Sequence, residues 1–208
     1  MSEPPVLAPS SAPFAPALRF QFTQRAHLLV GEVVRAGSSV LDATAGRGRD
    51  TLFLARCVGA AGRVLAVDVQ AEAIHSTDAL LRAAGVRERV ELVESDHAEL
   101  AALLVGRVLD GALFNLGFLP GGSREVVTRS DSTLRAIDAA LAVLRPGGRI
   151  VVTSYVGHPG GRREATALLR AWRRANGVTV VRELPPPWAR RRDAPRLFVL
   201  ERRSTHPG

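Results

Sequence analysis

The stretch Asp42-Ala43-Thr44-Ala45-Gly46-Arg47-Gly48-Arg49-Asp50 decides the fold of this chain. It joins a short apolar run, expected to be a strand over residues 39–43, to a helix expected over residues 50–58. Glycines at such a junction permit a tight turn and let a ligand approach the backbone. The amino end of the helix that follows favours a carboxylate or a phosphate. The stretch therefore predicts a nucleotide-like ligand at the first strand-to-helix turn.

Strand-like and helix-like segments alternate along the chain from about residue 19. Further strands are expected over residues 63–67, 90–93, 109–114, 149–155, 178–183 and 196–201, and further helices over residues 71–84, 98–104, 131–145 and 162–175. This alternation predicts a doubly wound α/β sheet. The last two strands have no helix between them, so they are expected to be antiparallel. The predicted fold is a Rossmann-like, mostly parallel seven-stranded sheet with a C-terminal antiparallel hairpin. It resembles the class I methyltransferase fold.

The 208 residues suit a single domain. Residues 1–18 are rich in proline and alanine and are expected to form a disordered arm, residues 19–203 one domain, and residues 204–208 a tail. No apolar stretch approaches the roughly 20 residues of a membrane helix, and no secretory signal opens the chain. The cytoplasm is therefore the expected location. With Cys57 as the lone cysteine, neither a disulfide framework nor a cysteine-rich zinc site is expected, and no metal. The sequence leaves the oligomeric state open.

Two ligands suit the glycine turn, a dinucleotide and S-adenosyl-L-methionine (SAM). The dinucleotide fingerprint requires glycine or alanine at position 51, where this chain has Thr51. Asp42, four residues before Gly46, completes instead the D-x-x-x-G-x-G pattern of SAM-dependent methyltransferases. Asp68 ends the second strand, where a carboxylate can accept hydrogen bonds from ribose hydroxyls. The expected cofactor-binding residues are Asp42, Thr44, Ala45, Gly46, Gly48, Asp50, Thr51, Asp68, Gln70, Asp96, His97 and Asn115. For Asp96, capping of the next helix is the competing interpretation.

The fourth strand runs into Asn115-Leu116-Gly117-Phe118-Leu119-Pro120-Gly121-Gly122, which is similar to the N-P-P-Y/F loop of methyltransferases that modify amino nitrogens. An Asn carbonyl can accept the hydrogens of an amine and fix the direction of its lone pair. Phe118 is expected to stack on a base. Leu116 and Gly117 stand where that loop has its two prolines. The similarity therefore supports direct coordination of the amine by Asn115 less strongly than a complete N-P-P-Y/F motif would.

The fifth strand runs into Tyr155-Val156-Gly157-His158-Pro159-Gly160-Gly161. His158 is the histidine expected to transfer a proton, and Tyr155 is expected to orient the base or the amine. The catalytic candidates are thus Asn115, His158 and Tyr155. Those expected to contact the substrate are Leu116, Gly117, Phe118, Pro120, Gly121, Gly122, Tyr155, His158, Arg190, Arg191 and Arg192. His27, His75 and His206 belong to no constellation in the sequence and are expected at the surface.

Taken in order, these motifs resemble the "putative rRNA methylase" family, which includes bacterial tRNA methyltransferases of the 5-aminomethyl-2-thiouridine wobble position. The resemblance covers about residues 22–202. It implies methyl transfer from SAM to the primary amine of 5-aminomethyl-(2-thio)uridine, with no metal. It also implies a tRNA partner, bound at the anticodon stem-loop.

The basic residues of the chain are concentrated near its C-terminus. Residues 158–208 hold 12 arginines and 4 acidic residues, a net charge of +8. This equals the net charge of the whole chain, so the rest of the chain is neutral overall. A one-sided basic surface is the electrostatic feature of a polyanion binder. Arg190, Arg191 and Arg192 are therefore expected to bind phosphates. The alternatives are methylation of another RNA such as rRNA or of a small amine, an RNA-binding protein without catalysis, and a nicotinamide-dependent oxidoreductase. Thr51 and the absence of lysine weigh against the last.

Overall fold

The computed structural model describes residues 16–96, 99–116, 130–156, 161–174, 178–184 and 194–203. Within these ranges one sheet of seven strands forms, in the order β3-β2-β1-β4-β5-β7-β6. Its strands are β1 (Ser39–Asp42), β2 (Arg63–Asp68), β3 (Val90–Glu94), β4 (Leu109–Leu116), β5 (Leu144–Ser154), β6 (Val178–Leu184) and β7 (Arg196–Arg202). Strands β1 to β5 pair in parallel, whereas β7 is antiparallel to both β5 and β6. The predicted fold class is confirmed.

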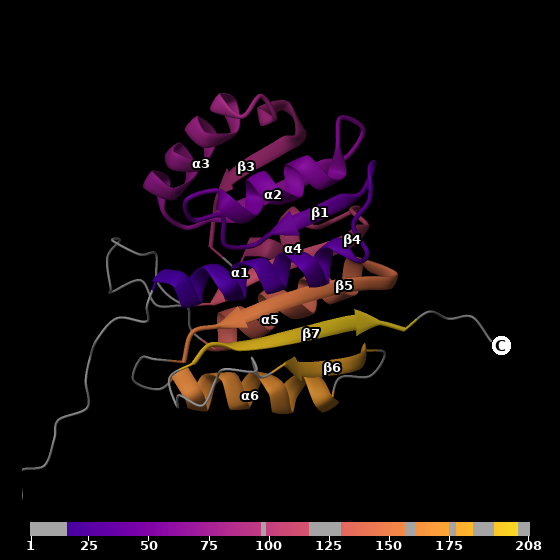
Figure 1. The fold of residues 1–208 in the computed structure, drawn as a ribbon. Helices are drawn as coiled ribbons and strands as arrows, with labels where there is room; N and C mark the ends of the chain where they lie inside the picture. The colour runs from indigo at the N-terminus through magenta and orange to yellow at the C-terminus, as the bar shows by residue number, and fades with distance from the viewer. Residues whose placement is uncertain are drawn as a thin grey trace, which may run out of the picture.

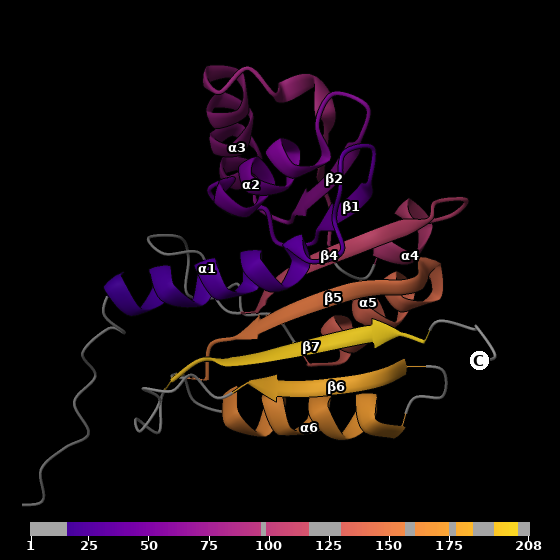
Figure 2. The same cartoon turned by 45° about the vertical axis from the view of Figure 1, so that its right-hand side comes forward.

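Helices cover both faces of this sheet. They are α1 (Pro16–Gly31), α2 (Arg49–Val58), α3 (Ala71–Ala83), the 3₁₀ turn η1 (Arg87–Arg89), α4 (Leu100–Leu103), α5 (Ser130–Val143) and α6 (Gly161–Arg174). Helices α1, α2 and α3 lie on the near face in Figure 1, and α4, α5 and α6 on the far face; the turned view in Figure 2 shows the same layers. No helix among the described residues is long and apolar enough to cross a membrane.

The core divides into two layers because successive strand residues point to opposite faces. On the side of α1 to α3, Val40, Val64, Leu113 and Val151 are buried together. On the other side the neighbouring strand positions pack against α4 to α6, and Trp172 of α6 meets Phe198 of β7 edge to face. Both faces of the central strands are therefore covered, and the carboxyl ends of β1, β2, β4 and β5 meet at one edge of the sheet.

Helix α1 corrects the expected boundary of the N-terminal arm. The helix begins at Pro16, within the range expected to be disordered, whereas residues 1–15 and the expected tail, residues 204–208, lie outside the described residues. Its buried side chains Phe22, Ala26 and Val30 recur every four residues, which places them on one face of a helix. Exposed Leu28 interrupts the apolar pattern. The helix packs against β5 and β4, where it reaches the edge at which the parallel strands end.

The boundary between α5 and β5 also differs from the prediction. The sequence predicts a helix that continues to residue 145 and a strand that begins at residue 149, but α5 ends at Val143 and β5 begins at Leu144. Proline disfavours helical geometry in the residue before it, so Pro146 prevents Arg145 from extending the helix. Leu144 instead pairs with Leu109 of β4. The register shifts between Leu109 and Gly111, and Gly147 has a φ of 74°.

Candidate functional site

The turn between β1 and α2 forms the centre of the candidate site. Gly46 and Gly48 have φ angles of 54° and 77°, in the left-handed region that favours glycine. A Cβ at Gly48 would lie 2.9 Å from Thr77 Oγ1 and 3.0 Å from Thr77 Cα, so α3 closes directly against this glycine. Thr77 Oγ1 in turn donates to the carbonyl of Gly46, at 3.2 Å. Both glycines are thus required by the backbone path of the turn.

Asp68, at the end of β2, is tied to this turn through its carboxylate. The N–H of Gly46 donates to Oδ2 at 2.8 Å, and the N–H of Gln70 donates to Oδ1 at 3.0 Å. The side chain is half-buried, and each oxygen keeps a further lone pair. The expected grouping of Gly46, Gly48 and Asp68 is therefore present in the structure, with Asp68 able to accept hydrogen bonds from a ligand.

Asp42 holds the turn from inside and is itself fully buried. The Thr51 hydroxyl donates to Oδ2 at 2.6 Å, and the N–H of Thr44 donates to Oδ1 at 3.2 Å. Burial raises the pKa of Asp42 to about 7, and the nearby Asp50 carboxylate adds to the rise. Since Asp42 and Thr51 have no exposed surface, a ligand at the turn would meet the backbone that they position rather than their side chains.

Asn115, near the end of β4, is connected to the same turn at two points. Its backbone N–H donates to Thr44 Oγ1 at 2.8 Å. Its side-chain Nδ2 donates to Asp50 Oδ2, from the first turn of α2. Asn115 is only partly buried, whereas Asp50 is 9% exposed. The residue expected to contact the acceptor is thus held by two residues expected to bind the cofactor.

His27 of α1 completes this arrangement, and the expectation that it lies at the surface is wrong. Its Nε2 is 2.6 Å from Asp50 Oδ1, and its side chain is only 19% exposed. The ring stacks on Phe53 of α2, with 3.9 Å between centroids and 3° between planes. The stripe of Phe22, Ala26 and Val30 is the sequence signal that could have revealed α1, with His27 next to that stripe. His75 is exposed, as expected.

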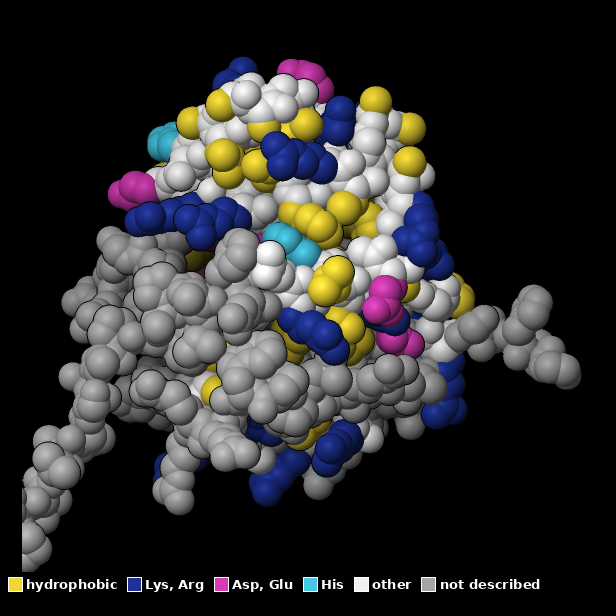
Figure 3. Space-filling view, in the orientation of Figure 1, with side chains coloured by type: hydrophobic (Ala, Val, Ile, Leu, Met, Phe, Trp, Pro, Cys, Tyr) yellow, Lys and Arg dark blue, Asp and Glu magenta, His cyan; other side chains and the backbone are white. Residues whose placement is uncertain are grey.

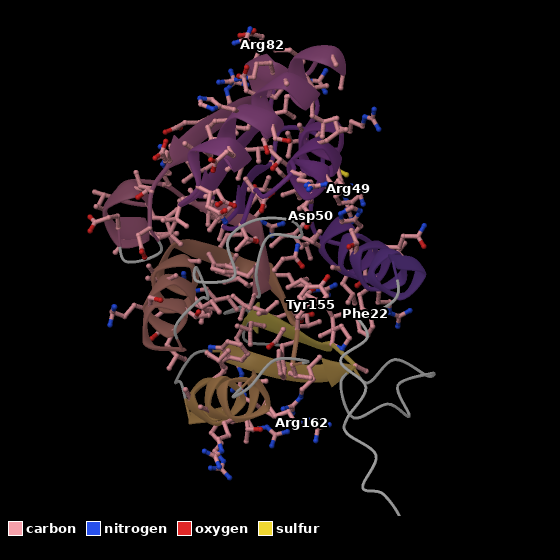
Figure 4. All side chains as sticks on the ribbon, turned by 90° about the vertical axis from the view of Figure 1, so that its left-hand side faces the viewer. Phe22, Arg49, Asp50, Arg82, Tyr155 and Arg162 are labelled. Carbon is pink, nitrogen blue, oxygen red and sulfur yellow. The ribbon has the colours of Figure 1, made fainter. Side chains whose placement is uncertain are left out.

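The remaining described candidates lie around the same edge. Ala45 is buried in the turn, Gln70 precedes α3 and Asp96 follows β3 with an exposed side chain. Leu116 is buried at the end of β4, and its carbonyl accepts the N–H of the partly exposed Tyr155 at 3.0 Å. Figure 4 faces this edge and shows Asp50 and Tyr155 near its centre.

Several predicted residues cannot be placed. His97, Gly117, Phe118, Pro120, Gly121, Gly122, His158, Arg190, Arg191 and Arg192 lie outside the described residues, as does His206. Their expected roles stay predictions. Within the described ranges, no group of three or more His, Cys, Asp or Glu side chains could hold a metal ion.

The sheet order, the two left-handed glycines after β1 and the acid that ends β2 define a class I methyltransferase. The family model described as "Putative rRNA methylase" matches residues 64–199, more than half of the chain. The chain belongs to this family.

Solved structures and a curated relative agree with this assignment. A Clostridium thermocellum structure with the same description is 30% identical, with a TM-score of 0.81 over 86% of this chain and 96% of that one. A Streptococcus mutans structure in complex with SAH is also 30% identical, with a TM-score of 0.75 over the same shares. The "tRNA (mnm(5)s(2)U34)-methyltransferase, chloroplastic" of Arabidopsis thaliana is 41% identical over 70% of this chain. The alignment spans 57% of that relative's length.

Proposed function

We propose that the protein transfers the methyl group of SAM to the primary amine of 5-aminomethyl-(2-thio)uridine at the wobble position of tRNA. The products are 5-methylaminomethyl-(2-thio)uridine and S-adenosylhomocysteine. The reaction forms one N–C bond, breaks one S–C bond and releases one proton from the amine. The similarity to the Arabidopsis tRNA methyltransferase supports this choice of substrate.

The glycine turn fits SAM as its cofactor. The left-handed Gly46 and Gly48 allow close approach to the backbone, and α2 begins just beyond them at Arg49. Asp68 offers carboxylate lone pairs for ribose hydroxyls, and the exposed Asp96 follows β3, the strand whose Glu94 pairs with Asp68. The bound sulfonium supplies an electrophilic methyl group. We expect the chain's own contribution to be alignment of the two reactants.

The observation that carries the proposal is the placement of Asn115. A primary amine attacks through its lone pair, so its hydrogens must be held on the opposite side. Asn115 lies near the end of a strand next to the cofactor turn and is fixed by Thr44 and Asp50. We infer that its carbonyl accepts an amine hydrogen. His158 is the predicted acceptor of the released proton, and Tyr155 a predicted contact of the base.

The tRNA proposal is supported by the charge on α6. Leu168, Leu169 and Trp172 are buried on the side of α6 that packs against the sheet. The opposite side of the helix exposes a basic surface made of Arg162, Arg163, Arg170 and Arg173. Figure 3 shows arginine side chains, in dark blue, along the lower edge of the molecule, where α6 lies in Figure 1. Such a surface would bind phosphates of the anticodon stem, together with the predicted contacts of Arg190, Arg191 and Arg192.

The test is incubation of the protein with labelled SAM and bulk tRNA from a strain that lacks the final methylation, followed by nucleoside analysis. We expect conversion of aminomethyl- to methylaminomethyl-uridine, and its loss in Asn115→Ala. SAM binding without transfer to tRNA would contradict the proposed substrate and favour rRNA or a small amine. RNA binding that SAM leaves unchanged, with no transfer to any acceptor, would favour a non-catalytic RNA-binding protein.

A further inference from the structure

We propose that His27 and Asp50 are positioning residues that fix the orientation of the Asn115 amide. The three side chains come from α1, α2 and β4, and they form one chain of hydrogen bonds, from His27 Nε2 to Asp50 and from Asn115 Nδ2 to Asp50. The inference rests on the proposed function of Asn115 as the contact of the acceptor amine. It adds a helix, α1, that no sequence motif connects with the site.

The direction of each hydrogen bond follows from the chemistry of Asp50. An ionised carboxylate only accepts hydrogen bonds, so Asp50 must face the NH₂ of Asn115 rather than its carbonyl. The nitrogen and the oxygen of an amide point in different directions from its carbon. With Nδ2 held by Asp50, the Oδ1 of Asn115 is therefore the end left to accept a hydrogen from another group. Asp50 thereby selects the orientation that an amine acceptor needs.

The second oxygen of Asp50 explains the role of His27. Asp50 is 9% exposed and lies close enough to Asp42 to raise the pKa of that buried carboxyl, so its charge needs donors. His27 Nε2 supplies one of them at 2.6 Å from Oδ1. Without this donor, we expect Asp50 to rotate to seek another, which would release the Asn115 amide.

His27 is itself rigidly placed. Its ring lies flat on Phe53 at a centroid distance of 3.9 Å, so the imidazole plane cannot swing freely. Two residues further along α1, the carbonyl of Leu29 accepts a hydrogen bond from Arg149 Nη1 at 2.5 Å, which attaches the helix to β5. A rigid donor on an anchored helix is suited to holding a carboxylate in one rotamer.

The alternative is that the His27–Asp50 pair only stabilises the contact between α1 and α2. The two roles predict different measurements. A stabilising pair changes the unfolding midpoint and leaves the properties of Asn115 unchanged. A positioning pair changes the environment of the Asn115 side-chain NH₂, and lowers kcat while the affinity for SAM is kept.

The experiment compares His27→Leu, His27→Gln and the control His75→Leu, which removes an exposed histidine of α3. Side-chain NH₂ signals of Asn115 are recorded on ¹⁵N-labelled protein and assigned by their absence in Asn115→Asp. We expect these signals to shift in His27→Leu and to return toward their wild-type positions in His27→Gln, whose amide can still donate. His75→Leu is expected to leave them unchanged.

Kinetics with SAM and the substrate tRNA complete the test. For His27→Leu we expect kcat to fall by about 10- to 100-fold with unchanged SAM affinity, and His27→Gln to recover most of this decrease. A folded His27→Leu protein with unshifted Asn115 signals, or with unchanged kcat, would overturn the inference. If wild-type protein methylates no amine at all, the proposed function fails, and the Asn115 signals still decide whether His27 positions this amide.

Discussion

Thr77 of α3 closes over Gly48, leaving 2.9 Å between its Oγ1 and the place that a Cβ at position 48 would occupy. The backbone Cα of Thr77 is just as near, at 3.0 Å, so rotation of the Thr77 side chain cannot relieve the conflict. The second helix after the cofactor turn therefore determines which residue the turn tolerates.

We expect Gly48→Ala to destabilise the protein by at least about 2 kcal/mol, because strain at positive φ adds to the clash with Thr77. SAM affinity should fall as well, because the turn has to move. Urea unfolding and titration calorimetry measure the two effects.

Gly85→Ala is the matched control for the backbone strain. Gly85 has a φ of 66°, and a Cβ there meets nothing within 4 Å. Gly85→Ala should lower the free energy of unfolding by only about 1 kcal/mol and leave the affinity for SAM unchanged. Equal decreases of stability in the two variants would show that contact with Thr77 contributes nothing.

The second prediction concerns the pH dependence of stability. Burial raises the pKa of Asp42 to about 7, so the folded protein keeps this proton over a range in which the unfolded chain, with an ordinary value of 3.8, has released it. The free energy of unfolding should therefore decrease as the pH rises from about 4 to about 7, by up to about 1.4 kcal/mol per pH unit.

Asp42→Asn should flatten this slope, because an amide can accept from the Thr44 N–H and donate to the Thr51 hydroxyl without ionising. Denaturant titrations at several pH values test it. Asp78→Asn, on the surface of α3, should retain the slope. An unchanged slope in Asp42→Asn would mean that another group carries the pH dependence.

Arg149 of β5 provides the third prediction. Its Nη1 lies 2.6 Å from Glu32 Oε2 of the segment after α1, and its Nη2 lies 2.6 Å from Glu201 Oε1 of β7. The arginine side chain is only 11% exposed. Arg149→Ala should therefore cost about 3 kcal/mol of unfolding free energy, measured by urea denaturation.

The control is Arg107→Ala, which breaks the more exposed ion pair with Glu91. Its cost should stay within about 1 kcal/mol. Similar costs for both arginines would indicate that Arg149 does not anchor α1 more strongly than a surface pair would.

The fourth prediction tests RNA binding by α6. Arg162 lies at the edge where the parallel strands end, whereas Arg82 lies at the far end of the molecule in the same view (Figure 4). Replacing Arg162 and Arg163 together by alanine should weaken tRNA binding. The log–log salt slope should become shallower by about 0.7 to 0.9 for each phosphate that the variant no longer binds.

Arg82→Ala removes an arginine of α3 whose side chain is 66% exposed, and it should leave tRNA affinity and salt slope unchanged. Equal effects of the two changes would indicate a general charge effect rather than a basic surface on α6. Filter binding at several salt concentrations measures both quantities.

The order of strands and helices could be predicted because turn residues separate the apolar runs. The boundary between α5 and β5 is harder to predict from the sequence, since the pairing of Leu144 with Leu109 depends on a strand that is distant in the chain. The sequence pattern does not predict helix α1, because exposed Leu28 obscures the stripe of Phe22, Ala26 and Val30. Local pattern thus predicted the fold class, and tertiary contacts determined the ends of the elements.

The candidate site divides in the same way. Gly46, Gly48 and Asp68 follow from a motif, because the ends of adjacent parallel strands meet. The contact between His27 and Asp50 joins residues 23 positions apart on two helices, and no spacing rule predicts it. It arises because α1 packs against β5, and the sequence near His27 does not predict that packing.

The packing of α1 on β5 has a consequence for the order in which the elements assemble during synthesis. Helix α1 is translated before the described strands of the sheet, yet the arginine that holds its Leu29 carbonyl is made 120 residues after Leu29. A nascent chain that stops short of β5 already contains the glycine turn, but it lacks the strand that α1 contacts most. His27 is thus translated well before β5, the strand that completes the support of its helix.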